Sequence, residues 1–168
     1  MPHFFLMNES EMQEADAALL RARLHIRSFW TLMRYRRFAH GICTLHDGFE
    51  NALRWFILCH APTIHVPGEP VSWASQAYRT LAKNELVTLD FDIDSFESLI
   101  TKALKSDFDE MNPDFDFKKL WIDIEKVFHA LEILPFDLDS LPEENELTRK
   151  TMGLDLKKND KDFRNKTI

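Results

Sequence analysis

FAHGICTLHDGFENALRWFILCH, residues 38–60, decides the fold class of this chain. Its apolar side chains recur at steps of three and four residues, a spacing that places them on one stripe of an α-helix. The stripe consists of Phe38, Ile42, Leu45, Phe49, Ala52, Leu53, Phe56 and His60. No other segment is as apolar over as great a length, so the pattern predicts a central helix of about six turns.

Four further segments carry a helical pattern of apolar residues and would pack around the central helix. Their predicted bounds are 10–36, 70–84, 94–105 and 117–134. Signals at the ends support these bounds, because Ser10 and Gln13 form a capping box and Pro135 stops the last helix. Asp94 or Ser95 is the expected N-cap of the third segment.

The first two helices must be separated by a turn, because together they would form one rod of about fifty residues, which is atypical of a compact domain. Gly41 is the residue in this region that weakens a helix. We place the turn between Tyr35 and Ala39, which allows the two helices to pack antiparallel.

Apolar and polar residues alternate from Val87 to Asp94. A period of two is typical of a β-strand. A lone strand is not stable, however, and the sequence contains no second convincing strand. We therefore favour an extended linker whose aspartates face water over a strand.

These patterns predict an all-α fold, an up-and-down bundle of four to five helices. Fourteen phenylalanines and four tryptophans indicate a large aromatic core. The predicted organisation is an N-terminal arm (1–9), the helical bundle (10–136), a short peripheral helix that Ser140 caps (137–153) and a flexible basic tail (154–168).

The net charge of −7 is unevenly distributed along the chain. Six arginines and no acid lie between Arg21 and Arg37, residues 85–146 are strongly acidic, and the tail after Leu147 is basic. A net acidic protein is a poor general ligand for nucleic acid, although a local basic face is compatible with this charge.

The sequence predicts a cytoplasmic protein with no membrane partner. Its apolar runs are too short to span a membrane, and MPHFFLMNESEMQE, residues 1–14, lacks the basic and apolar regions of a signal peptide. Cys43 and Cys59 both lie in the central helix, about 24 Å apart along its axis, which excludes a disulfide between them. Reduced thiols are typical of the cytoplasm.

One flank of the first helix carries basic residues at steps of four, three, four and three. We call this set the arginine ridge, and it consists of Arg23, Arg27, Trp30, Arg34 and Arg37. Arginines around a tryptophan suit phosphate binding and base stacking. The alternative is that the arginine stems cover the helix surface or pair with the acidic half of the chain.

The sequence contains no catalytic, cofactor or metal signature with reliable spacing, and we expect neither a cofactor nor a metal. His46 with Glu50, and Glu125 with His129, are each four residues apart. A di-iron bundle requires Glu and His three residues apart, with two further glutamates, so neither of these pairs has the required spacing. Cys43 belongs to no CxxC pair, so its expected role is that of a small buried apolar residue.

FENALRWFIL (49–58) follows a long first helix and an arginine-rich bend, and it resembles the second helix of HEPN domains. It is similar to the small nucleotidyltransferase substrate-binding branch of that superfamily, in which an aromatic–Glu pair, here Phe49–Glu50, opens such a run. SQAYRTLAKNELV (75–87) is similar to a later helix of that branch, after a proline-containing loop. The resemblance covers residues 10–131 and implies a helical bundle that usually dimerises.

HEPN ribonucleases carry an Arg, a polar residue and a His, closely spaced, near the start of the last core helix. The corresponding stretch here, DEMNPDFDFKKLW (109–121), contains neither Arg nor His. Arg34 and His40 have a similar spacing but lie at a different point of the chain. The resemblance therefore implies a binding role rather than nuclease activity.

Three functional hypotheses follow. The first is a non-catalytic binding or adaptor module that dimerises or pairs with a protein such as a nucleotidyltransferase or a toxin. Its arginine ridge would recognise a nucleotide or RNA phosphate, or an acidic partner. The second is an RNase or nucleotide-acting enzyme in which Arg34 steadies the phosphate and His40 transfers the proton. The third is an immunity or antitoxin-like protein whose acidic 85–146 region covers a basic toxin.

Overall fold

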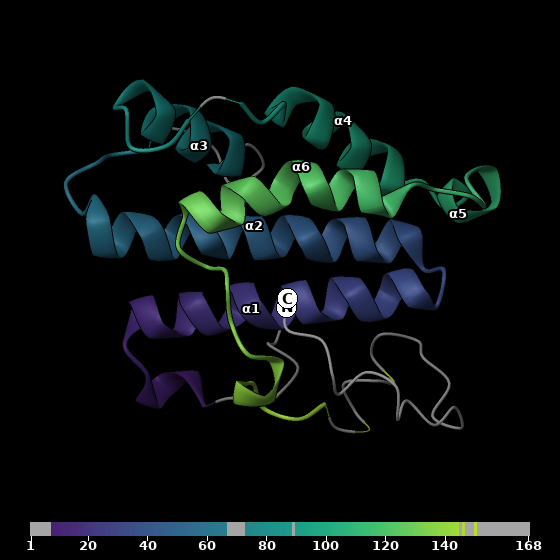
Figure 1. Ribbon diagram of the computed structural model, residues 1–168, viewed down its shortest axis with the longest axis horizontal. Coiled ribbons are helices and arrows are strands. Elements are labelled where there is room, and N and C mark those ends of the chain that lie inside the picture. The colour runs from purple at the N-terminus through teal and green to yellow at the C-terminus, as the bar shows by residue number, and fades with distance from the viewer. Residues whose placement is uncertain (1–7, 67–72, 89, 145, 147–149, 151–168) are drawn as a thin grey trace.

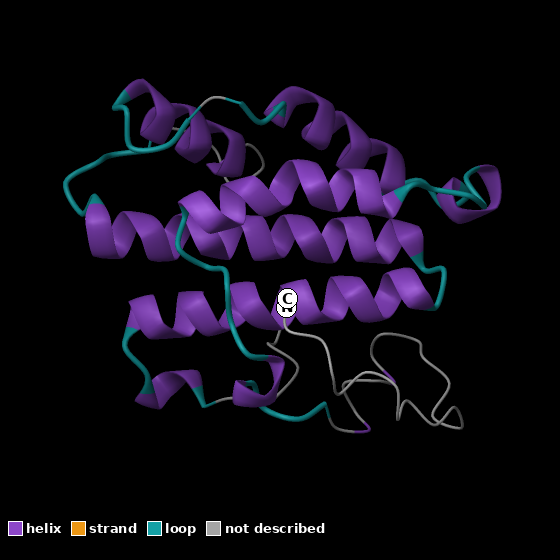
Figure 2. Cartoon of the chain, in the orientation of Figure 1, coloured by secondary structure: helices purple, strands orange, loops and turns teal. Residues whose placement is uncertain are grey.

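The computed structural model describes residues 8–66, 73–88, 90–144, 146 and 150. Within them the regular structure is helical, with no strand (Figure 2). The α-helices are α1 (Glu14–Arg34), α2 (Phe38–His60), α3 (Trp73–Lys83), α4 (Ile93–Ala103), α5 (Phe108–Met111) and α6 (Phe117–Ala130). The all-α prediction is confirmed. Among the described helices, none combines the length and apolar character needed to cross a membrane.

Helices α1 and α2 lie side by side and antiparallel, and they form the most extensive helix pair (Figure 1). Helices α3 and α4 lie on the side of α2 that faces away from α1 (Figure 1). Helix α6 lies in front of α2 and runs nearly parallel to it, and the chain after it descends across α1 (Figure 1). The central position predicted for residues 38–60 is therefore observed, and α2 contacts every other α-helix.

The turn between α1 and α2 occupies residues 35–37, as predicted. Arg36 adopts a left-handed backbone with φ of 57°, and the Arg37 amide donates to the Leu32 carbonyl at 2.9 Å. Gly41 does not make this turn. It is buried inside α2, where a Cβ atom would approach the Met33 Cε atom to 2.5 Å. Its role is the close packing of α1 against α2.

The predicted capping box at Ser10 is wrong. Helix α1 begins at Glu14, and its N-cap residue, Gln13, makes no side-chain cap. Ser10 lies instead in a short 3₁₀ turn, Glu9–Glu11, and its hydroxyl donates to the Asn8 side-chain oxygen at 2.7 Å. The Ser10 hydroxyl is therefore bonded to the nearby Asn8 side chain and does not cap α1.

Residues 84–92 form a linker, as favoured, although Leu89 lies outside the described residues. The alternation nevertheless corresponds to burial, since Val87 and Phe91 are buried and the polar residues between them are exposed. The Tyr78 hydroxyl donates to the Thr88 carbonyl at 2.6 Å. The Tyr78 side chain thus supplies a hydrogen bond to this extended segment, which in a β-sheet would come from a neighbouring strand.

The N-cap of α4 is Asp92 rather than the predicted Asp94 or Ser95. The Asp92 carboxylate accepts the Ser95 amide at 3.0 Å and the Ser95 hydroxyl at 2.7 Å. These bonds hold the pKa of Asp92 below its ordinary value. Ser95 is therefore the donor in this cap, and α4 begins earlier than its sequence suggested.

The C-terminal part differs most from its prediction. Helix α6 begins after its predicted N-cap, Asp116, but ends at Ala130, because Glu132 adopts a left-handed φ of 58°. Residues 141–144 are not helical, so the predicted peripheral helix does not begin at Ser140, although Glu146 and Lys150, within its predicted range, are helical. Most of its remainder, residues 1–7 of the predicted arm and the predicted tail 154–168 lie outside the described residues.

Two groups of aromatic rings fill the core. One joins α2, α3 and α4, and its members are Phe49, Tyr78, Phe91 and Phe96. The other joins α1, α2 and α6 with the loop before α6, and its members include Phe29, Trp30, Phe38, Phe115, Phe117, Trp121 and Phe128. The large aromatic core predicted from composition is therefore present and spans all the long helices.

Candidate functional site

The structure divides the arginine ridge into two parts. Arg23, Arg27 and Trp30, in the middle of α1, are only partly exposed, whereas Arg34 and Arg37 are exposed at the α1–α2 turn. Residues 131–144, which follow α6, lie across the first part. We call these residues the C-terminal strap, and they explain the division.

Arg23 binds the beginning of the strap. Its Nε atom donates to the Ile133 carbonyl at 3.2 Å, and its guanidinium lies over the Phe136 ring, 5.4 Å from the centroid. Burial lowers the pKa of Arg23. This arginine therefore holds a segment of its own chain, through a backbone acceptor and a cation–π contact.

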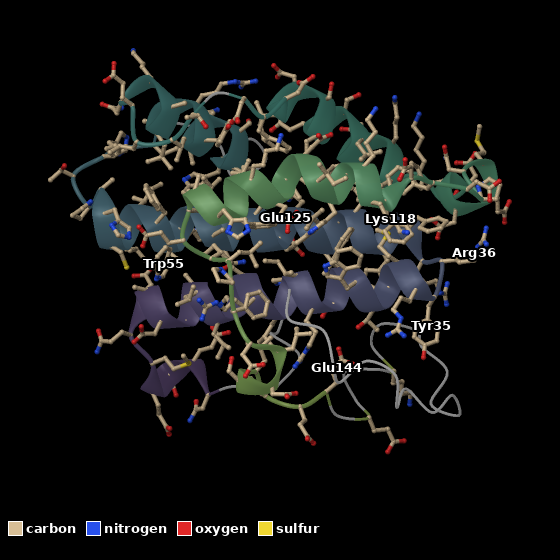
Figure 3. The ribbon with its side chains drawn as sticks, viewed as in Figure 1. Tyr35, Arg36, Trp55, Lys118, Glu125 and Glu144 are labelled. Carbon is tan, nitrogen blue, oxygen red and sulfur yellow. The ribbon has the colours of Figure 1, made fainter. Side chains whose placement is uncertain are left out.

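Arg27 binds the end of the strap. One of its terminal nitrogens donates to the Pro142 carbonyl at 2.6 Å, and its Nε atom lies 3.5 Å from a Glu144 carboxylate oxygen. The two side chains are only 11% and 15% exposed, and Figure 3 places Glu144 on the side of α1 away from α2. Burial lowers the pKa of Arg27, while Glu144 raises it. Pairing with the acidic half of the chain is thus confirmed for this arginine.

Trp30 is part of the core rather than a stacking platform. Its ring packs edge-on against Trp121, at a centroid distance of 5.2 Å, and against Phe29 and Phe117. The indole nitrogen is buried and has no hydrogen-bond partner within the described part of the chain. The indole is therefore partly buried among aromatic rings of α1 and α6.

The exposed part of the ridge lies beside an acidic loop. Tyr35, Arg36 and Lys118 occupy the same end of the bundle (Figure 3). Arg36 pairs with Asp114 at 3.6 Å and also donates to the Pro113 carbonyl. Basic charge at this turn is therefore partly balanced by the loop between α5 and α6.

Arg34 and His40, the alternative catalytic pair, come from the last turn of α1 and the first turn of α2. Burial and Arg37 lower the pKa of His40, while Asp47 and Asp109 raise it. The Asp109 carboxylate accepts the Ala39 amide at 2.7 Å, so it fills the anion position at the start of α2.

The outer face of α2 holds half-buried Cys43 and Asp47 one turn apart. Burial and Asp47 raise the pKa of the Cys43 thiol. The thiolate needed of a nucleophile is therefore disfavoured, in line with the apolar role expected for this cysteine. In the described part of the chain, no three His, Cys, Asp or Glu residues gather as metal ligands would.

Replacing Asp47 by asparagine is expected to raise the melting temperature at neutral pH. Burial raises the pKa of this carboxyl, with His46 lowering it and Glu50 raising it further. A pKa above the unfolded value means that the fold favours the protonated form, so the ionised carboxylate costs stability and the cost disappears as the pH falls. Thermal unfolding of Asp47→Asn should show a gain at neutral pH that shrinks as the pH falls through the raised pKa and is absent below about pH 4.

Asp123→Asn is the control for this experiment, because it makes the same change at an exposed position of α6. We expect it to leave the melting temperature nearly unchanged at every pH. Equal gains in the two variants, or a gain for Asp47→Asn that persists in acid, would show that burial of the carboxyl is not the cause.

Sequence reasoning missed the partners of the ridge. Pro142 and Glu144 lie more than a hundred residues after Arg27, and Asp109 lies seventy residues after the helix end that it caps. Periodicity identified the face that carries Arg23 and Arg27, but no local signal marks which distant segment covers it. Composition gave the only indication, an acidic half that could pair with a basic helix.

No protein-family model, no curated protein and no solved structure matches this chain. The similarity of residues 10–131 to HEPN domains therefore stays a prediction from the sequence, and the function below is argued from the geometry and charge of this chain alone.

Proposed function

We propose that this protein is a non-catalytic helical module that binds a basic partner protein through its α4–α5 surface. The observation that carries the proposal is a pair of highly exposed apolar side chains, Leu104 and Met111, within a strongly acidic segment of the chain. They are 73% and 72% exposed. Exposed apolar side chains in a segment of net negative charge suit a partner of opposite charge.

Charge is concentrated between Glu85 and Asp116. This segment holds ten carboxylates and two lysines, a net charge of −8 against −7 for the whole chain. Eight of the carboxylates are exposed, namely Glu85, Asp90, Asp92, Asp94, Asp107, Glu110, Asp114 and Asp116. A surface of this kind repels nucleic acid and accelerates encounter with a basic protein.

Exposed apolar residues reinforce the choice of this surface. Single exposed apolar side chains are common on proteins. Here the three most exposed large ones among the described residues come from three consecutive elements, with Leu104 after α4, Met111 in α5 and Ile122, 56% exposed, in α6. Helices α4 and α5 are in contact. Apolar anchors surrounded by polar residues are the usual source of binding energy at interfaces.

The proposal keeps the protein-partner part of the adaptor hypothesis and changes the surface. Arg23 and Arg27 hold the strap, and Trp30 packs in the core, so these ridge residues support the fold. Charge complementarity, the basis of the immunity hypothesis, gives the partner its expected sign. The enzyme hypothesis, with Arg34 and His40 as its residues, stays a prediction from the sequence.

Proteins retained by the immobilised full-length chain test this proposal. Four forms are compared: wild type, Leu104→Ser/Met111→Ser, Asp107→Asn/Glu110→Gln, and Leu58→Ser, which changes an exposed apolar residue of α2. We expect one basic protein to be retained by wild type and Leu58→Ser and lost from both double variants. With that protein purified, each double variant should weaken affinity about tenfold or more, and added salt should weaken wild-type binding.

Two results would contradict the proposal. The first is retention of the same proteins by all four forms. The second is retained material that absorbs at 260 nm and disappears after nuclease treatment, since this would show a nucleic acid ligand. Light scattering of the purified chain in the same buffer identifies a homodimer, whose loss in Leu104→Ser/Met111→Ser would point to a second copy as occupant.

A further inference from the structure

We propose that Asp109 positions the α4–α5 surface: it fixes α5 to the start of α2 and thereby holds Met111 outward for the partner. The inference rests on the proposed function for the role of Met111, whereas the attachment of α5 through Asp109 can be measured without any partner. Asp109 is thus a positioning residue, which acts on binding through Met111.

Helix α5 is too short to determine its own position. It consists of a single turn, Phe108–Met111, and a turn of this length is not stable in isolation. Among the described contacts, its N-cap residue, Asp107, makes no side-chain cap, and Phe108 is the residue of α5 that is buried in the core. The place of α5 and the direction of its side chains therefore depend on contacts with the rest of the bundle.

The start of α2 lacks a cap of its own. Its N-cap residue is Arg37, whose side chain carries donors alone and therefore accepts no amide. The first amides of a helix have no partner within it, and the helix dipole favours a negative charge beside them. The Asp109 carboxylate meets both needs, since it accepts the Ala39 amide at 2.7 Å. This charge-assisted bond joins α5 to α2 at one defined point.

Phe108 and Asp109 together fix the orientation of α5. The Phe108 ring packs edge-on against Phe115, at a centroid distance of 5.7 Å, and Phe115 in turn lies 5.8 Å from the Phe38 ring of α2. A single buried ring leaves the turn free to rotate about the point where the ring is held. The bond from Asp109 to the Ala39 amide is the second contact, and it decides which side of α5 faces α2.

The direction of Met111 follows from this orientation. Successive residues of an α-helix are about 100° apart around its axis, so Asp109 and Met111, two positions apart, project from nearly opposite sides. With Asp109 turned towards α2, Met111 is turned to solvent, where it is 72% exposed. Asp109 itself is half-buried, unlike most carboxylates between Glu85 and Asp116. Its charge is used inside the fold, so it affects the surface through position.

Arg36 makes the other polar contact to this loop. It donates to the Pro113 carbonyl and pairs with Asp114 at 3.6 Å, and both side chains of the pair are largely exposed. Exposed ion pairs contribute little stability, because water and salt screen them. The partly shielded bond of Asp109 is therefore the polar contact whose loss should change α5 most.

Hydrogen exchange of full-length variants tests the attachment without a partner. The Met111 amide, bonded to the Asp107 carbonyl, reports on α5, and the Ile133 amide, bonded to the Phe128 carbonyl, reports on the rest of the fold. In Asp109→Ala, we expect the exchange rate of Met111 relative to that of Ile133 to rise at least about fivefold.

Two matched variants accompany this measurement. Asp109→Asn removes the charge but keeps a side-chain oxygen that can accept the Ala39 amide, so the ratio should stay close to that of wild type. Asp114→Ala removes a carboxylate of the same loop that makes an exposed ion pair, and it should also leave the ratio unchanged.

A synthetic amphipathic helix made of leucine and lysine is the probe for binding, titrated calorimetrically into the full-length chain. Asp109→Ala should weaken its affinity about tenfold, because Met111 is no longer held outward. Asp109→Asn lacks the same charge yet should bind within about threefold of wild type. Loss of binding in Leu104→Ser/Met111→Ser shows that the peptide occupies the α4–α5 surface.

Equal exchange ratios in wild type and Asp109→Ala would overturn the proposal. An Asp109→Asn variant that behaves like Asp109→Ala would do the same, since charge rather than position would then be the cause. Unchanged peptide affinity in Asp109→Ala, despite a raised exchange ratio, would also overturn it. Failure of the proposed function looks different.

If that function is wrong, wild type and Leu104→Ser/Met111→Ser would bind the peptide equally or not at all. This would overturn the binding role of Asp109 as well. A raised exchange ratio in Asp109→Ala would still establish that this residue fixes α5 to α2.

Discussion

Replacing Phe49 by alanine is expected to lower the free energy of unfolding by about 3–5 kcal/mol. Phe49 has no exposed surface and sits where α2, α3 and α4 meet. Its ring centroid lies 6.0 Å from that of Tyr78 and 5.9 Å from that of Phe91. Removing it leaves a cavity bounded by the rings of Tyr78 in α3, Phe91 in the linker and Phe96 in α4, which are fixed by separate segments and cannot collapse together.

Urea unfolding monitored by circular dichroism measures this change, with the slope of the transition checked for equality between variants. Leu104→Ala is the control, because it removes an apolar side chain that is 73% exposed. Its expected effect lies within about 0.5 kcal/mol of wild type. A loss of less than about 1 kcal/mol for Phe49→Ala would mean that the rings around it repack, contrary to a fixed aromatic core.

The central helix could be predicted to the residue because its apolar pattern and the signal at its C-terminal end are local. From Phe38 to His60 the apolar period is unbroken, and Pro62 prevents continuation at one end. The bend at residues 35–37 followed from the need for two helices rather than from a turn motif. Arg36 takes the left-handed conformation without a glycine, which no propensity rule indicates.

The failures have a common physical origin in long-range contacts. The sequence predicts that helix α6 continues to Leu134, because no residue before Pro135 breaks a helix. It ends at Ala130 because Ile133 donates to the Phe128 carbonyl and turns the strap towards α1. The capping of α2 by Asp109 is equally non-local. Sequence periodicity finds a face and its extent, whereas the segment that covers the face depends on the tertiary fold.

The candidate site illustrates the same limit. The ridge from Arg23 to Arg37 lies on one flank of α1, as its spacing predicts. Spacing does not distinguish an arginine that faces solvent from one that holds another segment, because both arginines produce the same periodic pattern in the sequence. Arg27 is only 11% exposed, and Pro142 and Glu144 return to it from the far end of the chain. The predicted recognition surface therefore consists of a part that packs against other segments and a part, Arg34 and Arg37, that is exposed to solvent.

Replacing Gly48 by leucine is expected to destabilise the protein by about 3 kcal/mol or more, through overpacking between α1 and α2. A Cβ atom built on Gly48 would lie 3.1 Å from the His25 Cβ atom and 3.5 Å from the Ala22 carbonyl oxygen. These atoms belong to the backbone of α1 or are fixed directly to it, so they cannot rotate away. A larger side chain must therefore push the two longest helices apart.

Gly41 provides the matched comparison, because it lies on the same helix and also faces α1. There an added Cβ atom would meet the Cε atom of Met33 at 2.5 Å, the far end of a flexible side chain that can change rotamer. Alanine should therefore be tolerated better at Gly41 than at Gly48, although both changes gain about 1 kcal/mol of helix propensity. Urea unfolding of the two alanine variants and of Gly48→Leu measures the difference. Equal tolerance of alanine at both positions would contradict this prediction. It would mean that α1 and α2 pack less closely at Gly48 than the distances from its Cβ position indicate.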